Sequence, residues 1–232
     1  MAQDEKASDF SVAIEDFLKE MWKRNPVNAT AVGVHDYDKE MGEFSISAIE
    51  DKIVWLKKQL TRFERMDSTT LAGAEAEDLR LTTAWIRTQL LFMDEMEMFR
   101  ISPVIYPELC VYACYLLCVR EYAPIEERLS SVVKRLTQVS RVLDEARANL
   151  SNPPRIWVEL AVETSEGVIK FLKGALASLF AQTPSLRKDF EKVSARAMSA
   201  FEEFSRFLRE HLLESCSGSY AIGRDRFEFL LK

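Results

Sequence analysis

The run from residue 109 to residue 119 constrains the fold more than any other stretch, because it has no charged side chain and no helix breaker. A helix that is apolar on every face has to be enclosed by other helices or by lipid. Its eleven residues would rise only about 16 Å, roughly half the thickness of a bilayer core. Pro103 and Pro107 limit the helix upstream, and Arg120 follows it directly downstream. The sequence therefore predicts a buried central helix at about residues 105–119, wrapped by the amphipathic segments on either side.

The other segments show apolar residues at helical spacing, and none alternates as a strand would. We expect helices at about residues 9–24, 27–32, 48–63, 76–99, 125–150, 156–179, 184–213 and 224–231. Ser8 is the expected N-cap of the first, and Ser47 with Glu50 forms a capping box before the third. With no linker and no repeat, we expect one all-α domain over residues 1–232, a bundle of about seven to eight helices around the central one.

Charge and apolar patterning exclude several classes of partner. Lys and Arg number 31 against 37 Asp and Glu, and this net charge of −6 argues against a nucleic-acid partner. No uncharged run approaches the ~18–20 residues of a membrane span. The first ten residues are polar where a signal peptide would be apolar, and four cysteines without the spacing framework of a secreted disulfide scaffold fit a reducing compartment. We therefore expect a cytoplasmic protein without membrane or nucleic-acid contacts.

The residue types that carry most metal and nucleophile chemistry are sparse. The two histidines, His35 and His211, are far apart, and no HExxH, CxxC or glycine-rich phosphate loop is present. Cys110, Cys114 and Cys118 lie at i, i+4 and i+8 on one helix face, which could suit a soft metal or redox chemistry. One helix cannot wrap three thiolates around one ion, and cysteine also fills tight cores as a small apolar residue. We expect reduced, buried cysteines, no metal, no cofactor and no assignable catalytic residue.

The loop around residues 35–38 is the best candidate for a polar pocket. His35, Asp36 and Tyr37 offer hydrogen-bond donors and acceptors in one short segment, although such a segment can also serve to cap its own backbone. Tyr220 and Arg224, near the end of the chain, complete the candidate binding set. Acid–base chemistry would require these groups to lie within hydrogen-bond reach of one another. A structure that placed His35 against Tyr220 or Arg224 would favour an enzyme.

Three motifs in order resemble a widespread family catalogued as domain of unknown function 885. They are NPVNATAVGVHDYDKEMGEFS from residue 25, REYAPIEERLSSVVKRLTQVSRVLDEARANLSNPP from residue 120, and GSYAIGRDRFEFLL from residue 218. The resemblance implies that Gly33, His35, Asp36, Gly218, Tyr220 and Gly223 match recurrent family positions that have no assigned role. Longer members look like helical zinc peptidases with a His-Glu motif in their later half. No residue of this chain matches that motif.

The resemblance implies a non-catalytic helical binding module that corresponds to the N-terminal half of a peptidase-like protein. Two alternatives stay open: a hydrolase-type enzyme that uses the 35–38 loop, or the substrate-covering half of a zinc peptidase supplied by a longer chain. Phe227, Leu230 and Leu231 on the short terminal helix are the expected contact with a second copy or with a protein or peptide partner.

Overall fold

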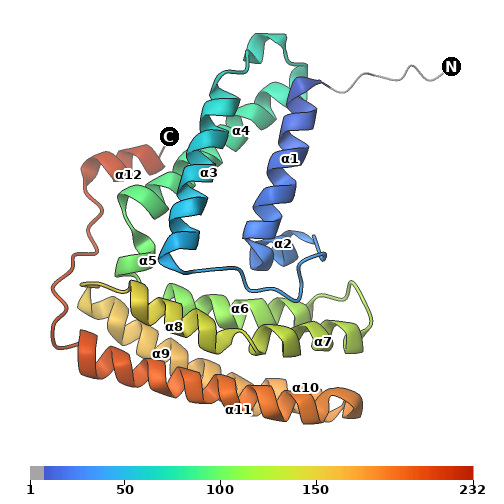
Figure 1. The fold of residues 1–232 in the computed structure, drawn as a ribbon, viewed down its shortest axis with the longest axis vertical. Coiled ribbons are helices and arrows are strands. Elements are labelled where there is room, and N and C mark those ends of the chain that lie inside the picture. The colour runs from blue at the N-terminus through green and yellow to red at the C-terminus, as the bar shows by residue number, and fades with distance from the viewer. Residues whose placement is uncertain (1–7, 232) are drawn as a thin grey trace.

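The computed structural model describes residues 8–231, and every regular element in this part of the chain is helical. Figure 1 shows three helices standing upright above a second layer of helices that lie across them. The upright group comprises α1 (Asp9–Arg24), α3 (Ile46–Glu64) and α4 (Gly73–Leu90), with a 3-10 turn at Ser68–Thr70 and a π-helical turn at Leu91–Glu95. The single-domain architecture predicted from the sequence thus takes the form of two helical layers.

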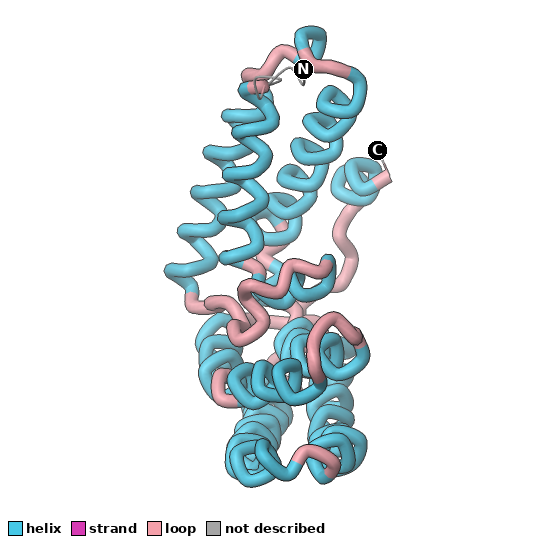
Figure 2. Tube along the Cα trace, turned by 90° about the vertical axis from the view of Figure 1, so that its right-hand side faces the viewer, coloured by secondary structure: helices cyan, strands magenta, loops and turns pink. Residues whose placement is uncertain are grey.

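The lower layer forms the larger part of the fold, and Figure 2 shows its helices nearly end-on. It contains α6 (Ile105–Val119), α7 (Ile125–Leu136), α8 (Val139–Asn149), α9 (Arg155–Phe171), α10 (Ala177–Ala181) and α11 (Pro184–Phe207), with π-helical turns at Leu172–Leu176 and Leu208–Leu212. Three short helices lie outside the two groups: α2 (Pro26–Val32) and α5 (Met98–Ile101) at their junction, and α12 (Arg224–Leu230) near the C-terminus.

Each layer has its own hydrophobic cluster. In the upper cluster, Phe17 stacks on Trp55 with ring centroids 5.3 Å apart and meets Phe63 edge-on at 5.4 Å. The lower cluster gathers the inward faces of α6 to α11, and it also includes Val27 of α2 and Met41 of the following connection. The segment between α1 and α3 therefore contributes to the lower core while it joins the upright helices to it.

The central helix α6 has the predicted bounds, but the expected enclosure on all sides is wrong. Tyr112, Tyr115 and Val119 are 45%, 49% and 49% exposed. Helix α6 packs against α2, α7, α8 and α9, and these neighbours cover only part of its circumference. A tyrosine ring can present an apolar body while its hydroxyl stays in water, so an uncharged sequence did not guarantee burial. One apolar face of α6 remains open.

Three helix boundaries also differ from those expected. The single helix expected at 76–99 ends at Leu90, and a π-helical turn at Leu91–Glu95 and the left-handed Glu97 separate it from α5. Ser45, not Ser47, caps α3: its hydroxyl accepts a hydrogen bond from the Ala48 amide at 3.2 Å. Serine is a favoured N-cap residue at either position. The backbone of Ser45, with φ −59° and ψ 152°, has the non-helical conformation that an N-cap requires. The single helix expected at 125–150 is two helices. At the break, the Gln138 side chain accepts from the Met41 amide and donates to the Lys39 carbonyl.

The cysteines differ in burial. Cys110 and Cys114 are buried, whereas Cys118, expected to be buried, is partly exposed, as is Cys216. Burial raises the pKa of the Cys114 thiol to about 12 and that of Cys118 to about 11, and it raises the pKa of Cys110 as well. A thiolate is the reactive form, so these three thiols should react slowly.

We therefore expect a maleimide to label Cys216 first in the native protein. Cys110 and Cys114 should be labelled only after unfolding, and Cys118 should react more slowly than Cys216. Peptide mass spectrometry over a labelling time course measures the order. Rapid labelling of Cys110 or Cys114 under native conditions would contradict the burial of α6 on its inner face.

Candidate functional site

The connection after α2 is an ordered turn. Helix α2 ends at Gly33, whose φ of 90° is a conformation that glycine adopts readily. The Asp38 amide then donates to the His35 carbonyl at 3.3 Å, and the Glu40 amide donates to the Tyr37 carbonyl at 3.0 Å. The loop thus caps its own backbone, which is one of the two roles that its sequence predicted.

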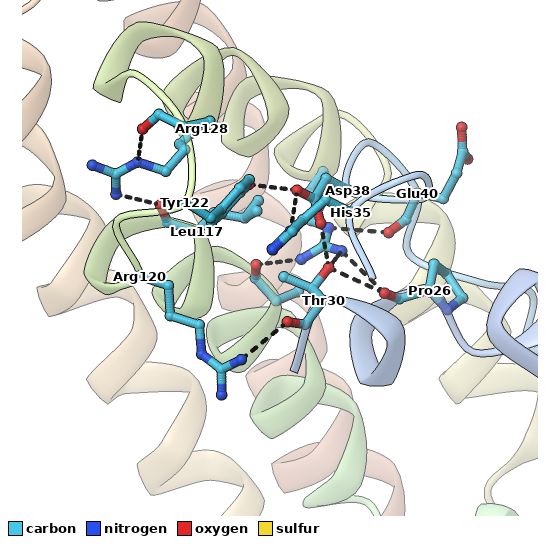
Figure 3. A network of polar contacts seen from close by, with 12 residues as sticks. Pro26, Thr30, His35, Asp38, Glu40, Leu117, Arg120, Tyr122 and Arg128 are labelled. Carbon is cyan, nitrogen blue, oxygen red and sulfur yellow. Dashed lines mark hydrogen bonds and ion pairs between the residues drawn. The ribbon is translucent and has the colours of Figure 1, made fainter. Parts of the chain in front are cut away.

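Asp38 is the centre of a polar network drawn in Figure 3. Its buried carboxylate accepts hydrogen bonds from the Thr30 hydroxyl at 2.6 Å, from His35 Nδ1 at 2.9 Å and from the Tyr122 hydroxyl. Because a carboxylate only accepts, Nδ1 of His35 carries a proton. The His35 ring also stacks on Tyr122, with centroids 3.4 Å apart and planes 7° apart. Burial and the bond to Asp38 raise the pKa of Tyr122, so its hydroxyl remains a donor.

Arg135 of α7 connects this network to the lower core. Its side chain has no exposed surface, and its guanidinium donates to the Ala113 carbonyl at 2.6 Å and to the Glu40 carbonyl at 3.1 Å. A third bond, of 2.6 Å, goes to the Thr30 hydroxyl, which donates in turn to Asp38. Thr30 thus bridges a buried cation and a buried anion. We call Thr30, His35, Asp38, Tyr122 and Arg135 the polar joint.

A second guanidinium supports the polar joint from one side. Arg128 is buried and donates to the carbonyls of Leu117, Cys118 and Ala123, where α6 ends and the connection to α7 begins. A cation at the last carbonyls of a helix compensates their unpaired negative ends. The position of Tyr122 in the connection is thereby fixed.

A cavity of about 270 Å³ adjoins the polar joint. Its lining residues come from the loop, the α6–α7 connection and α7: His35, Asp36, Asp38, Lys39, Tyr122, Glu127, Ser130 and Ser131. Tyr37 lies elsewhere, in a separate cavity of about 490 Å³ that also contains Lys52. The loop therefore stands between two cavities, and only His35 and Asp36 of the three loop candidates share one.

Tyr220 and Arg224 are not part of this site. Tyr220 is 68% exposed, and the Arg224 side chain pairs with Glu228 of its own helix at 2.6 Å. The arm that carries them is fixed at Gly218, where a side chain would meet the Asn152 carbonyl at 2.2 Å. The five residues singled out from the sequence are thus distributed over two cavities and the C-terminal arm, and His35 contacts neither Tyr220 nor Arg224 in any described hydrogen bond.

Sequence reasoning missed Thr30, Tyr122 and Arg135, which complete the polar joint. A signal was present in α7, where Arg128, Ser131 and Arg135 recur at i, i+3 and i+7 beside the apolar stripe and are all buried. Polar residues at that spacing also mark an ordinary solvated face, so the pattern alone does not distinguish the two.

The zinc site that the family resemblance implies for longer proteins has no counterpart in residues 8–231. No group of three or more His, Cys, Asp or Glu side chains there could hold a metal ion. The side chains of the polar joint instead form hydrogen bonds with one another and with backbone carbonyls. No helix in the same part of the chain has the length and apolarity needed to cross a bilayer.

Two apolar surfaces are open. The exposed face of α6 borders a groove of about 520 Å³ lined by Ile105, Glu108, Leu109, Val111, Tyr112 and Tyr115. Helix α12 has no buried residue, and it exposes Phe227, Phe229, Leu230 and, just beyond it, Leu231. Exposed apolar residues that gather in this way are typical of interaction surfaces.

Comparisons with known proteins fit this architecture. A solved structure, described as that of a "putative lipoprotein of unknown function" from Shewanella oneidensis, superposes with a TM-score of 0.83 at 20% sequence identity. The similarity covers 96% of this chain but 42% of the Shewanella protein, so the chain spans less than half the length of that relative. No curated protein matches. Residues 26–232 match the family described as "Bacterial protein of unknown function (DUF885)", and the chain belongs to that family.

Proposed function

We propose that the chain is a non-catalytic helical module that binds an apolar polypeptide segment through the open face of α6. The observation that carries the proposal is the groove beside Tyr112 and Tyr115, two tyrosines that are each about half exposed. Tyrosine is enriched among the residues that dominate protein interfaces, because it buries a large ring and retains a hydrogen-bonding hydroxyl. Glu108 is the charged residue of the groove, which favours a basic residue on the partner.

The length of the solved relative supports a polypeptide as the occupant. More than half of that protein lies outside the region shared with this chain. A segment that continues the chain in longer relatives is therefore the source of occupant that we favour, and the open face of α6 is a surface that such a segment would cover. The same role would make this fold the substrate-covering half of a larger protein.

The C-terminal end is a second contact in this proposal. Phe227 and Leu231 are 55% and 71% exposed, and a helix of seven residues is marginal without packing. Arg226 donates to the Glu95 carbonyl at 2.9 Å, which holds α12 beside the upright helices and leaves its apolar side chains outward. A partner or a second copy would bury them.

The test is a selection of helical peptides on the immobilised protein, counterselected against a Tyr112→Asp, Tyr115→Asp double variant. We expect amphipathic peptides with apolar and basic residues, bound with a Kd on the order of micromolar and at least about tenfold more weakly by the double variant. Val54→Asp is the matched control, because Val54 is 66% exposed on α3, away from the groove. Peptides that bind wild type and double variant equally, or no enriched peptides at all, would exclude the α6 face as the binding surface.

Self-association is measured separately by sedimentation velocity. If a second copy is the occupant of the C-terminal end, a concentration-dependent dimer should be lost in a Phe227→Asp, Leu231→Asp double variant. A wild type that stays monomeric at high concentration would exclude self-association through this end.

A second candidate function is hydrolysis at the cavity beside the polar joint. The His35–Asp38 hydrogen bond has the arrangement of a base and the carboxylate that orients it, and Ser130 and Ser131 line the same cavity. Hydrolysis of an activated ester that disappears in His35→Gln and persists in Tyr220→Phe would favour it. Equal rates in wild type and His35→Gln would exclude it.

Our proposed location is the cytoplasm. The solved relative is described as a lipoprotein, which makes attachment to a membrane the alternative. Fractionation of the native host cell with an antibody against this protein distinguishes the two.

A further inference from the structure

The second cavity beside the 35–38 loop, separate from the one next to the polar joint, is lined by a lysine in an unusual environment. It lies between the end of α1, the first turns of α3 and the loop, and has a volume of about 490 Å³. Lys52 of α3 lines it, half-buried, and its ammonium donates to the Asn25 side-chain carbonyl. The nearest cationic influence is Arg24, from the last turn of α1.

Two of the carboxylates that line the cavity are paired with arginines. Glu20 is paired with Arg24 at 2.7 Å, and Glu43 is paired with Arg141 at 2.9 Å. No ion pair found in residues 8–231 involves Lys52. The other charged or titratable groups that line the cavity are Lys23, Tyr37, Glu40 and Asp51.

Burial and the positive charge of Arg24 lower the pKa of Lys52 from 10.5 to about 8. At pH 7.5 a far larger fraction of Lys52 is therefore neutral than of an ordinary lysine. A neutral amine has a free electron pair and is nucleophilic, whereas an ammonium is not. Lys52 thus combines a reactive form at neutral pH with access to a cavity.

We propose that Lys52 is a modification site at which dissolved carbon dioxide adds to the amine to give a carbamate. The nitrogen electron pair forms a bond to the carbon of CO₂, one C–O π bond breaks, and its electrons remain on oxygen as a carboxylate. One N–H proton leaves to water. The reaction neither oxidises nor reduces any group, and it needs no reactant beyond CO₂.

The Arg24 cation favours the product over the ammonium. Repulsion between the Lys52 and Arg24 cations becomes attraction when Lys52 carries a carboxylate. The Asn25 carbonyl can still accept from the remaining N–H. The modification would change the charge at this position from +1 to −1, next to the segment that joins the two helical layers.

The test equilibrates the wild-type protein with ¹³C-labelled bicarbonate at pH 7.5, traps carbamates by alkylation with a trialkyloxonium salt, and maps them by peptide mass spectrometry. Lys58, an exposed lysine on the same helix, is the internal reference. We expect at least about tenfold more trapped carbamate on Lys52 than on Lys58, since burial and the Arg24 cation favour the neutral, nucleophilic form of Lys52.

An Arg24→Gln variant should lower the Lys52 signal toward that of Lys58, and a Lys58→Arg variant should leave it unchanged. A ¹³C carbamate resonance in the native protein that is absent from Lys52→Arg provides a second readout without trapping. Trapped carbamate on Lys52 no higher than on Lys58 would overturn the proposal.

Discussion

Arg135→Met should lower the free energy of unfolding by about 3–5 kcal/mol, the usual cost of removing one partner from a buried charge network. The guanidinium has no exposed surface and satisfies the carbonyls of Ala113 and Glu40 as well as the Thr30 hydroxyl. Methionine keeps much of the volume but offers no donor, so the acceptors and the buried Asp38 carboxylate would lose their compensation. The loss is a large part of the ~5–15 kcal/mol that holds a domain folded.

The matched control is Lys134→Met, which removes the same charge from the adjacent, exposed position of α7. Urea unfolding followed by far-ultraviolet circular dichroism should show a change of no more than about 0.5 kcal/mol for the control. If Arg135→Met were as stable as Lys134→Met, the guanidinium would not be buried in the joint as described.

Cys114→Arg should abolish folding at ordinary temperature. Cys114 is buried on the inner face of α6. Burial, together with the neighbouring Cys118 thiol, raises the pKa of the Cys114 thiol to about 12, so a charged side chain is unfavourable at this position. An arginine there would be larger than the space and would place a second cation near Arg135 without a carboxylate to pair with it. The expected penalty, above ~5 kcal/mol, reaches the stability of a typical domain.

The control for this variant is Tyr115→Arg, one residue further along α6 and 49% exposed. It should remain folded, with a cooperative thermal transition and unchanged helicity. A folded Cys114→Arg protein would mean that the inner face of α6 is accessible to water. Loss of folding in both variants would instead mean that the face we describe as open is covered.

The helical class and the bounds of α6 followed from local physics. Proline upstream and charge downstream define where that helix can run, and the structure has it at Ile105–Val119. What surrounds a helix depends on its neighbours in space, so the open face with Tyr112 and Tyr115 could not be predicted from composition. The break between α7 and α8 was likewise not predicted; there Gln138 contacts Lys39 and Met41, about a hundred residues away in the sequence.

The candidate site was predictable only in its local part. His35 and Asp38 belong to one short turn, and a single sequence shows them together. Tyr122 reaches Asp38 across 84 positions, and Arg135 reaches Thr30 across 105. Such contacts follow from the packing of α2 on α6 and of α6 on α7, and no spacing rule within one element encodes them.

The separation of the two hydrophobic clusters has a consequence for optical experiments. Of the four tryptophans, Trp22, Trp55 and Trp85 pack against the upper cluster, and only Trp157 lies in the lower layer, on α9. Intrinsic fluorescence will therefore report mainly on the upright helices, whereas the circular dichroism signal comes largely from the longer set of helices below. Denaturation curves from the two probes will coincide only if the polar joint makes both layers melt as one unit. A gap between their midpoints would measure directly how weakly the layers are coupled.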